Sequence, residues 1–261
     1  MLSTLKSIFY WARFLLSAPA CVYCGERLSH PYSPICPSCH EKYEEIKTEN
    51  CSRCSRILHK CSCTNKYLST HFIKKHFKVF RYQNREENAV ANTLIYYLKR
   101  MNCADVRDFF INELVGILSD FVAENGDVVF TNIPRRRAAV LEFGYDHALE
   151  LAKGVARHFG RPYVNLLKSR TKKPQKLLHG KDRETNVIFD LRCGKYDNLK
   201  GSTVVIIDDI VTTGSSMATA AALIRSLGVK KIVAASIAAT YKDMPSPLRV
   251  AELERRKKHK K

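Results

Sequence analysis

The 261-residue sequence lacks any apolar segment long enough to cross a membrane, which argues against an integral membrane protein. It is also short of acidic residues, because 25 Asp and Glu stand against 44 Lys and Arg, giving a formal net charge of +19. Such an excess of positive charge favours binding to polyanions, which include nucleic acid, anionic membrane surfaces and phosphorylated metabolites. The charge alone does not identify which of these is the partner. Hydrophobic residues make up 45% of the chain, enough for a core, so the composition excludes wholesale disorder.

The first twenty residues contain the apolar stretch SIFYWARFLLSAPA, with a basic residue before it and small residues preceding Cys21, as in a signal peptide or a lipoprotein cleavage site. Arg13 interrupts this run, which is also too short to span a bilayer. We therefore predict an amphipathic helix over residues 1–19 and a cytoplasmic protein.

Eight of the ten cysteines lie between residues 21 and 63, in the patterns C-x2-C-x11-C-x2-C and C-x2-C-x6-C-x-C. Paired C-x2-C knuckles in a long basic chain are typical of zinc in a reducing compartment, rather than of a disulfide framework. The simplest arrangement takes the cysteines in sequential quartets, although a crossed pairing also fits, and His59 could replace a cysteine in the second. We predict a double zinc-ribbon module over residues 20–66, with one or two structural Zn²⁺ ions held by Cys21, Cys24, Cys36, Cys39, Cys51, Cys54, Cys61 and Cys63.

Hydrophobic periodicity predicts the remaining elements. The expected strands are 76–82, 127–134, 162–167, 203–207 and 231–237, and the expected helices are 86–101, 105–123, 144–160 and 215–227. Strands and helices alternate from about residue 127 onwards, which predicts an α/β fold with a parallel sheet flanked by helices, in a domain over residues 76–242. Residues 243–261 end in RRKKHKK and are expected to form a basic, solvated tail.

The stretch TVVIIDDIVTTGSS, residues 203–216, ends an apolar strand on Asp208 and Asp209 and continues into hydroxyl side chains around Gly214. In a parallel sheet, ligands bind at the C-terminal ends of strands, and the first N–H groups of the following helix attract anions. Glycine allows the backbone to approach such a ligand closely, and two carboxylates can accept hydrogen bonds from a pair of ribose hydroxyls. The alternative, that Asp209 or Thr213 merely caps the next helix, explains one residue only. The stretch therefore predicts a site for a phosphorylated sugar.

This stretch resembles the phosphoribosyl pyrophosphate (PRPP) loop of type I phosphoribosyltransferases. The resemblance implies that Asp208 and Asp209 hold the ribose hydroxyls, that Mg²⁺ accompanies PRPP, and that the 5-phosphate binds to Thr212, Thr213, Gly214, Ser215 and Ser216. Neither the Gly-x-Gly-x-x-Gly loop of dinucleotide-binding proteins nor a loop ending in Gly-Lys-Ser/Thr is present.

The cysteine module and two further segments, NIPRRRAAVLEFGYDHALELA and KPQKLLHGKDRETNV, narrow the resemblance to the ComF family. It implies a pyrophosphate loop with Arg135 and Arg136. It also implies a flexible loop that closes over PRPP, with Lys172, Lys173 and Arg183. The family's Arg-Gly-Phe-Asn-Gln segment appears here as FGYDH, residues 143–147, without its arginine, for which the three arginines after Pro134 could compensate.

The ComF resemblance implies a role in DNA uptake during natural transformation, with single-stranded DNA and uptake proteins such as a helicase as partners. The net charge of +19 agrees with such a role. The intact acid and hydroxyl motif keeps two alternatives open: a phosphoribosyltransferase that moves the ribosyl phosphate of PRPP to a nitrogen acceptor, and a PRPP-sensing regulator. No side chain stands out as a catalytic base.

Overall fold

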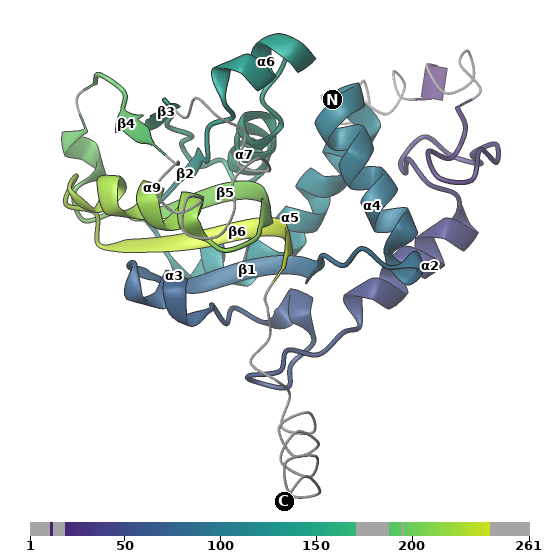
Figure 1. Cartoon of the computed structure of the whole chain (residues 1–261), viewed down its shortest axis with the longest axis horizontal. Coiled ribbons are helices and arrows are strands. Elements are labelled where there is room, and N and C mark those ends of the chain that lie inside the picture. Colours follow the sequence, from purple (N-terminus) through teal and green to yellow (C-terminus); the bar gives the residue numbers. More distant parts are fainter. Residues whose placement is uncertain (1–10, 13–18, 171–187, 195, 241–261) are drawn as a thin grey trace, which may run out of the picture.

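The computed structural model of the chain describes residues 11–12, 19–170, 188–194 and 196–240 (Figure 1). The helix predicted over residues 1–19, apart from residues 11, 12 and 19, and the predicted tail lie outside the described residues. Among the helices that the structure describes, none combines the length and the apolar character needed to cross a membrane.

The centre of the molecule is a four-stranded parallel sheet with the order β1-β6-β5-β2. A separate antiparallel pair, β3 and β4, lies beside α9 (Figure 1). This architecture confirms the predicted parallel sheet. The strands are β1 (Ile73–Arg81), β2 (Val128–Asn132), β3 (Leu167–Ser169), β4 (Phe189–Leu191), β5 (Thr203–Val211) and β6 (Lys231–Ala239).

Helices cover both faces of this sheet, and the side chains of β5 show why. Val205 and Ile207 belong to one hydrophobic core with α5 and α7, whereas Val204 and Ile206 belong to a second core with α3 and α9. Alternate residues of a strand point to opposite faces, so the unbroken apolar run of β5 is buried on both sides. The helices named here are α3 (Lys66–Thr70), α5 (Ala104–Glu124), α7 (His147–His158) and α9 (Ser215–Arg225).

The strand predicted over 203–207 is longer than expected, because β5 continues to Val211. Asp208 pairs with Ser236 of β6, so the two acids lie within the sheet rather than after it. Main-chain pairing with a buried neighbour has outweighed the poor strand propensity of aspartate. The strand predicted over 162–167 is reduced to a single bridge between Tyr163 and Phe130, followed by β3.

Several short elements complete the fold. The helix predicted over 86–101 begins with a 3-10 turn, η2, and ends in a π turn, η3, that leads to Asn102 in the left-handed conformation. The cysteine module contains α2, which starts directly after Cys36 and was not predicted. These elements are α2 (Pro37–Lys47), η1 (Leu58–Lys60), η2 (Glu86–Asn88), α4 (Ala89–Tyr96), η3 (Tyr97–Met101), α6 (Arg137–Phe143) and η5 (Asp197–Leu199).

Candidate ribose-phosphate site

Two cavities meet where β5 ends. The first, which we call the loop cavity, has a volume of about 450 Å³ and is lined by all seven residues predicted to bind PRPP: Asp208, Asp209, Thr212, Thr213, Gly214, Ser215 and Ser216. The second, the arginine cavity, has a volume of about 290 Å³ and is lined by Arg135 and Arg136. Lys99 and the two acids line both cavities, so the structure brings the acid and hydroxyl motif together with two of the three arginines after Pro134, while the third, Arg137, is exposed and lines neither cavity.

The loop between β5 and α9 is a tight bend over residues 212–214. Gly214 stands at the N-cap of α9 with φ of +90°, a conformation that side chains with a Cβ rarely adopt. Thr213 Oγ1 accepts a hydrogen bond from the Ser215 backbone N–H at 3.3 Å and donates to Ser215 Oγ at 3.1 Å. The hydroxyls thus order the bend, which directs the first turn of α9 toward the loop cavity.

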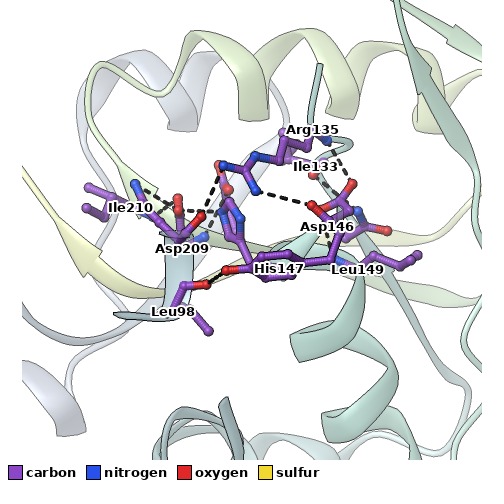
Figure 2. Close-up of polar contacts among 12 residues, drawn as sticks. Leu98, Ile133, Arg135, Asp146, His147, Leu149, Asp209 and Ile210 are labelled. Atoms are coloured by element: carbon purple, nitrogen blue, oxygen red, sulfur yellow. Dashed lines mark hydrogen bonds and ion pairs between the residues drawn. The ribbon is translucent and has the colours of Figure 1, made fainter. Parts of the chain in front are cut away.

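Asp209 is the electrostatic centre of the site (Figure 2). Its Oδ2 atom lies 2.6 Å from His147 Nε2 and 2.8 Å from Lys99 Nζ, and Oδ1 accepts a hydrogen bond from the Ile210 backbone N–H. Burial alone would raise the pKa of Asp209, but the charges of Lys99 and then His147 outweigh it and hold the pKa well below its usual range. The carboxylate is therefore ionised and held by two basic side chains from other elements.

Asp208, its neighbour, lies in a different environment. The side chain is half-buried, and Oδ1 accepts a hydrogen bond from the Asp209 backbone N–H at 2.9 Å. Burial and then the negative charge of Asp209 raise the pKa of Asp208 well above its usual range. The two acids of the motif are consequently not equivalent, since Asp209 is engaged inside the protein and Asp208 faces the junction of the two cavities.

Lys99 and His147 were missed as site residues in the sequence analysis. His147 lies in the FGYDH segment, and the resemblance of that segment to a family motif could have indicated a site residue. His147 is the first residue of α7, and Asp146 caps this helix by accepting a hydrogen bond from the Leu149 backbone N–H at 3.2 Å. Lys99 had no comparable signal, because it reaches Asp209 from the π turn η3, and helical periodicity does not predict such a turn.

Arg135 supports the site rather than pointing freely into it. Its guanidinium donates to the carbonyl oxygens of Tyr145 at 3.1 Å and Lys99 at 3.2 Å, and its central carbon lies 4.5 Å from the centre of the Phe143 ring. Figure 2 shows this side chain between the FGYDH segment and Asp209. Arg136 lines the arginine cavity as well. The other three predicted cations, Lys172, Lys173 and Arg183, lie outside the described residues.

The eight clustered cysteines form two groups in sequential order, the first with Cys21, Cys24, Cys36 and Cys39 and the second with Cys51, Cys54, Cys61 and Cys63. Within each group the four sulfur atoms lie within 4.8 Å of one another. Among the described side chains, His59 belongs to neither group, and its Nδ1 lies 3.3 Å from the Lys47 carbonyl oxygen. The structure thus favours sequential over crossed pairing.

The donor set fits zinc. In a tetrahedral ZnS₄ centre with Zn–S bonds of about 2.3 Å, the sulfur atoms are about 3.8 Å apart, and the sulfurs of Cys54 and Cys61 are separated by 3.5 Å. Burial raises the pKa of Cys21 and Cys51, but hydrogen bonds from backbone N–H groups within each cluster, those of Cys24 and Cys36 to Cys21 and those of Arg53 and Cys54 to Cys51, outweigh it and bring the pKa of each to about 7. Both groups of cysteines could therefore hold a Zn²⁺ ion through thiolates.

Comparison with known proteins agrees with this geometry. Residues 146–252 match the family described as Phosphoribosyl transferase domain. The ribose-phosphate pyrophosphokinase of Saccharolobus solfataricus is 37% identical over 90 residues, which are 34% of this chain and 27% of that protein. The protein of the same name from Thermococcus kodakarensis is 36% identical over 85 residues, 33% of this chain and 25% of its own length. The chain thus spans about a quarter of the length of these curated relatives.

Two solved structures align with part of this chain. An adenine phosphoribosyltransferase aligns with a TM-score of 0.38 and 16% identity, over 54% of this chain and 74% of its own. The phosphoribosylpyrophosphate synthetase from Mycobacterium smegmatis aligns with a TM-score of 0.34 and 19% identity, over 65% of this chain and 52% of its own. The residues matched by the family model, 146–252, include the loop between β5 and α9.

Proposed function

We propose that this chain binds PRPP, with the 5-phosphate in the loop cavity. The observation that carries the proposal is the placement of the hydroxyl loop, at the end of a central parallel strand and the start of α9, beside two carboxylates. The first N–H groups of a helix have no partners within the helix and favour an anion. The names of both curated relatives contain ribose-phosphate, which supports the same class of ligand.

The ribose would lie at the junction of the two cavities, where Asp208 accepts hydrogen bonds from its 2- and 3-hydroxyls. Asp209 would contribute its charge and keep Lys99 in place, and the pyrophosphate would enter the arginine cavity near Lys99 and Arg136. Mg²⁺ prefers oxygen ligands and would accompany PRPP, with Asp208 as the carboxylate within reach, and it would neutralise charge on the pyrophosphate. A cytoplasmic location belongs to the proposal, because thiolate clusters persist in reducing compartments.

PRPP binding is compatible with two outcomes. In a phosphoribosyltransferase, a nitrogen of the acceptor attacks C1 of PRPP, the C1–N bond forms, and the C1–O bond breaks so that pyrophosphate leaves with its charge beside Lys99 and Arg136. In a PRPP-sensing regulator, the same ligand binds without turnover. Release of pyrophosphate from PRPP in the presence of candidate acceptors distinguishes the two.

Handling of single-stranded DNA during natural transformation, with a partner such as a helicase, is the role that the ComF resemblance suggests. A specific observation supports it: Arg56 and Lys60 line a cavity of about 860 Å³ between the second cysteine cluster and α5, with Phe77 in its wall. The α5 side of this cavity carries Glu113 and Asp120, so the support comes from its basic side and from the net charge of +19.

Calorimetric titration with PRPP and Mg²⁺ tests the main proposal. We expect binding by the wild type, affinity weakened by at least about tenfold in Asp208→Asn because the amide offers one acceptor oxygen in place of two and cannot bind Mg²⁺ as a carboxylate does, and normal affinity in Asp197→Asn. Asp197 is exposed and lines neither cavity, so this control makes the same charge change elsewhere. A folded wild-type protein that does not bind PRPP would refute the proposal.

The DNA-handling role has a separate signature. Single-stranded DNA binding that persists in Asp208→Asn and weakens steeply with salt would support it, because phosphate contacts release counterions. DNA binding that is unaffected by salt, or lost in Asp208→Asn, would contradict a basic surface distinct from the PRPP site.

A further inference from the structure

A short piece of chain after the second cysteine cluster contacts the loop between β5 and α9. Cys63, its last member, is followed by Thr64, whose carbonyl oxygen accepts a hydrogen bond from Arg53 inside the knuckle. The next residue is Asn65, whose Nδ2 makes a long contact of 3.5 Å with the carbonyl oxygen of Thr213. Only two peptide units therefore separate a cysteine of the cluster from a side chain that touches the loop.

Asn65 is also the N-cap of α3, which lies against α9 and the loop. Its Oδ1 accepts a hydrogen bond from the Leu68 backbone N–H at 2.7 Å, so the same side chain caps the helix and contacts Thr213. Leu68 is fully buried. A Cβ built on Gly214 would lie 2.7 Å from Leu68 Cδ2, so the backbone of the loop rests directly on this leucine.

The cluster is also attached to the central sheet. Ser62, between two of its cysteines, accepts a hydrogen bond from the His76 backbone N–H of β1 at 3.0 Å. Lys78, almost fully buried, donates to the Cys63 carbonyl oxygen at 2.7 Å, and its Nζ lies 3.7 Å from Cys61 Sγ. These contacts join the segment that carries Cys61 and Cys63 to β1 in the interior of the protein.

The first cluster has different surroundings. Cys21, Cys36 and Cys39 belong to the core formed with α4, α5 and one face of the sheet, and α2 follows Cys36 directly. In Figure 1, α2 lies to the right of the sheet, whereas α9 lies across one face of it. The first cluster therefore provides a matched control for the second, with the same ligand chemistry and no described contact to the loop.

We propose that Asn65 and Leu68 are positioning residues for the loop at residues 212–216, and that metal bound to the second cysteine cluster holds them in place. The inference rests on the proposed function, because it matters for PRPP only if the loop binds the 5-phosphate. It predicts that ligand affinity depends on the second cluster and not on the first.

The test compares Cys54→Ser with Cys24→Ser in the full chain, since both cysteines are exposed and each closes the first C-x2-C knuckle of its cluster. Metal analysis gives the zinc content of each variant. Amide hydrogen exchange of residues 212–216, without ligand, measures loop order, and calorimetry measures PRPP affinity. We expect loop exchange faster by more than about tenfold in Cys54→Ser, with weaker PRPP binding, and wild-type values for both in Cys24→Ser.

Asn65→Ser keeps a capping oxygen but cannot reach Thr213, which separates loop positioning from folding. We expect loop exchange about threefold faster, as loss of one weak hydrogen bond implies, with unchanged zinc content and unchanged exchange in α7. This variant also keeps the inference testable if Cys54→Ser does not fold. Wild-type loop exchange in Asn65→Ser, or equal effects of Cys24→Ser and Cys54→Ser, would overturn the inference. Failure of wild-type protein to bind PRPP would instead remove the proposed function, while the exchange data still report on the loop.

Discussion

The imidazole of His147 lies 2.6 Å from Asp209 Oδ2, which joins the start of α7 to the central strand β5 (Figure 2). Both side chains are buried, and Lys99 approaches the same oxygen from η3. The contact therefore fixes three elements around the junction of the two cavities. Replacing His147 or Asp209 should therefore change the stability of the protein.

Replacing His147 by Ala should lower the free energy of unfolding by about 2 kcal/mol, because a buried hydrogen bond to a charged acceptor is lost. His147→Gln can still donate a hydrogen bond to Asp209 and should cost much less. Urea unfolding curves of the two variants provide the comparison. Equal losses would mean that packing of the ring, and not its contact with Asp209, stabilises the fold.

The two neighbouring acids should respond differently to neutralisation. Asp209→Asn leaves Lys99 and His147 facing an uncharged amide, and should cost about 2–4 kcal/mol, a value reduced from that of a fully buried pair because Lys99 is partly exposed. Asp208→Asn should leave stability within about 0.5 kcal/mol or raise it. The raised pKa of Asp208 means that its ionisation costs stability as the pH increases, and asparagine removes that cost. Urea unfolding at pH 7 measures the stability of both variants. Equal losses of unfolding free energy in Asp209→Asn and Asp208→Asn would contradict the different roles of the two acids.

Gly214→Ala should destabilise the protein by about 2–4 kcal/mol, because it combines a strained positive φ with overlap against Leu68. Gly228→Ala is the control, since Gly228 has φ of +75° but its added Cβ would meet only the flexible Lys200 side chain at 3.4 Å. This control should cost about 1–2 kcal/mol from the backbone alone. Thermal unfolding of the two variants separates the backbone cost of a positive φ from the cost of overlap with Leu68. A loss of stability in Gly228→Ala as large as that in Gly214→Ala would rule out the contact with Leu68 as a cause.

A pH dependence is expected from His76, which lies 2.8 Å from Ser236 Oγ in the sheet. Burial and then the charge of Lys78 lower the pKa of His76 well below its ordinary value of 6.5. Below that value the unfolded chain takes up a proton that the folded protein does not, so the folded state loses about 2 kcal/mol between pH 7 and pH 5 from this group.

His76→Gln retains a donor toward Ser236 but does not titrate. The stability of the wild type should therefore fall more steeply than that of the variant between pH 7 and pH 5, as measured by urea unfolding at each pH. Parallel curves for the two proteins would show that the buried imidazole does not contribute to the pH dependence.

Much of the fold was predictable because its signals are local. The apolar run of residues 203–207 and the amphipathic pattern of residues 144–160 reflect burial on two faces and on one face, and both elements formed. The extension of β5 to Val211 was not predictable in this way, since the pairing of Asp208 with Ser236 depends on a strand that lies further along the chain.

The part of the site that is contiguous in sequence was predictable, and the part that depends on tertiary contacts was not. The hydroxyl loop and its acids are contiguous, so their pattern is visible in sequence, and all of them line one cavity. Lys99 reaches Asp209 across more than a hundred residues through a π turn, and no periodicity carries that information. The use of Arg135 as a support for the Tyr145 and Lys99 carbonyl groups likewise depends on tertiary contacts.

The insertion of Leu68 into the core shared with α9 has a consequence for how this chain can be divided. A fragment that begins at residue 76 would lose Leu68 beneath Gly214 and would remove the Cys63 carbonyl oxygen from Lys78. A recombinant truncation that keeps these two contacts therefore has to begin before Cys63. The boundary between the cysteine module and the sheet is therefore not a boundary between two independent packing units, because the residues that follow the last cysteine of the second cluster are part of the core beneath the loop.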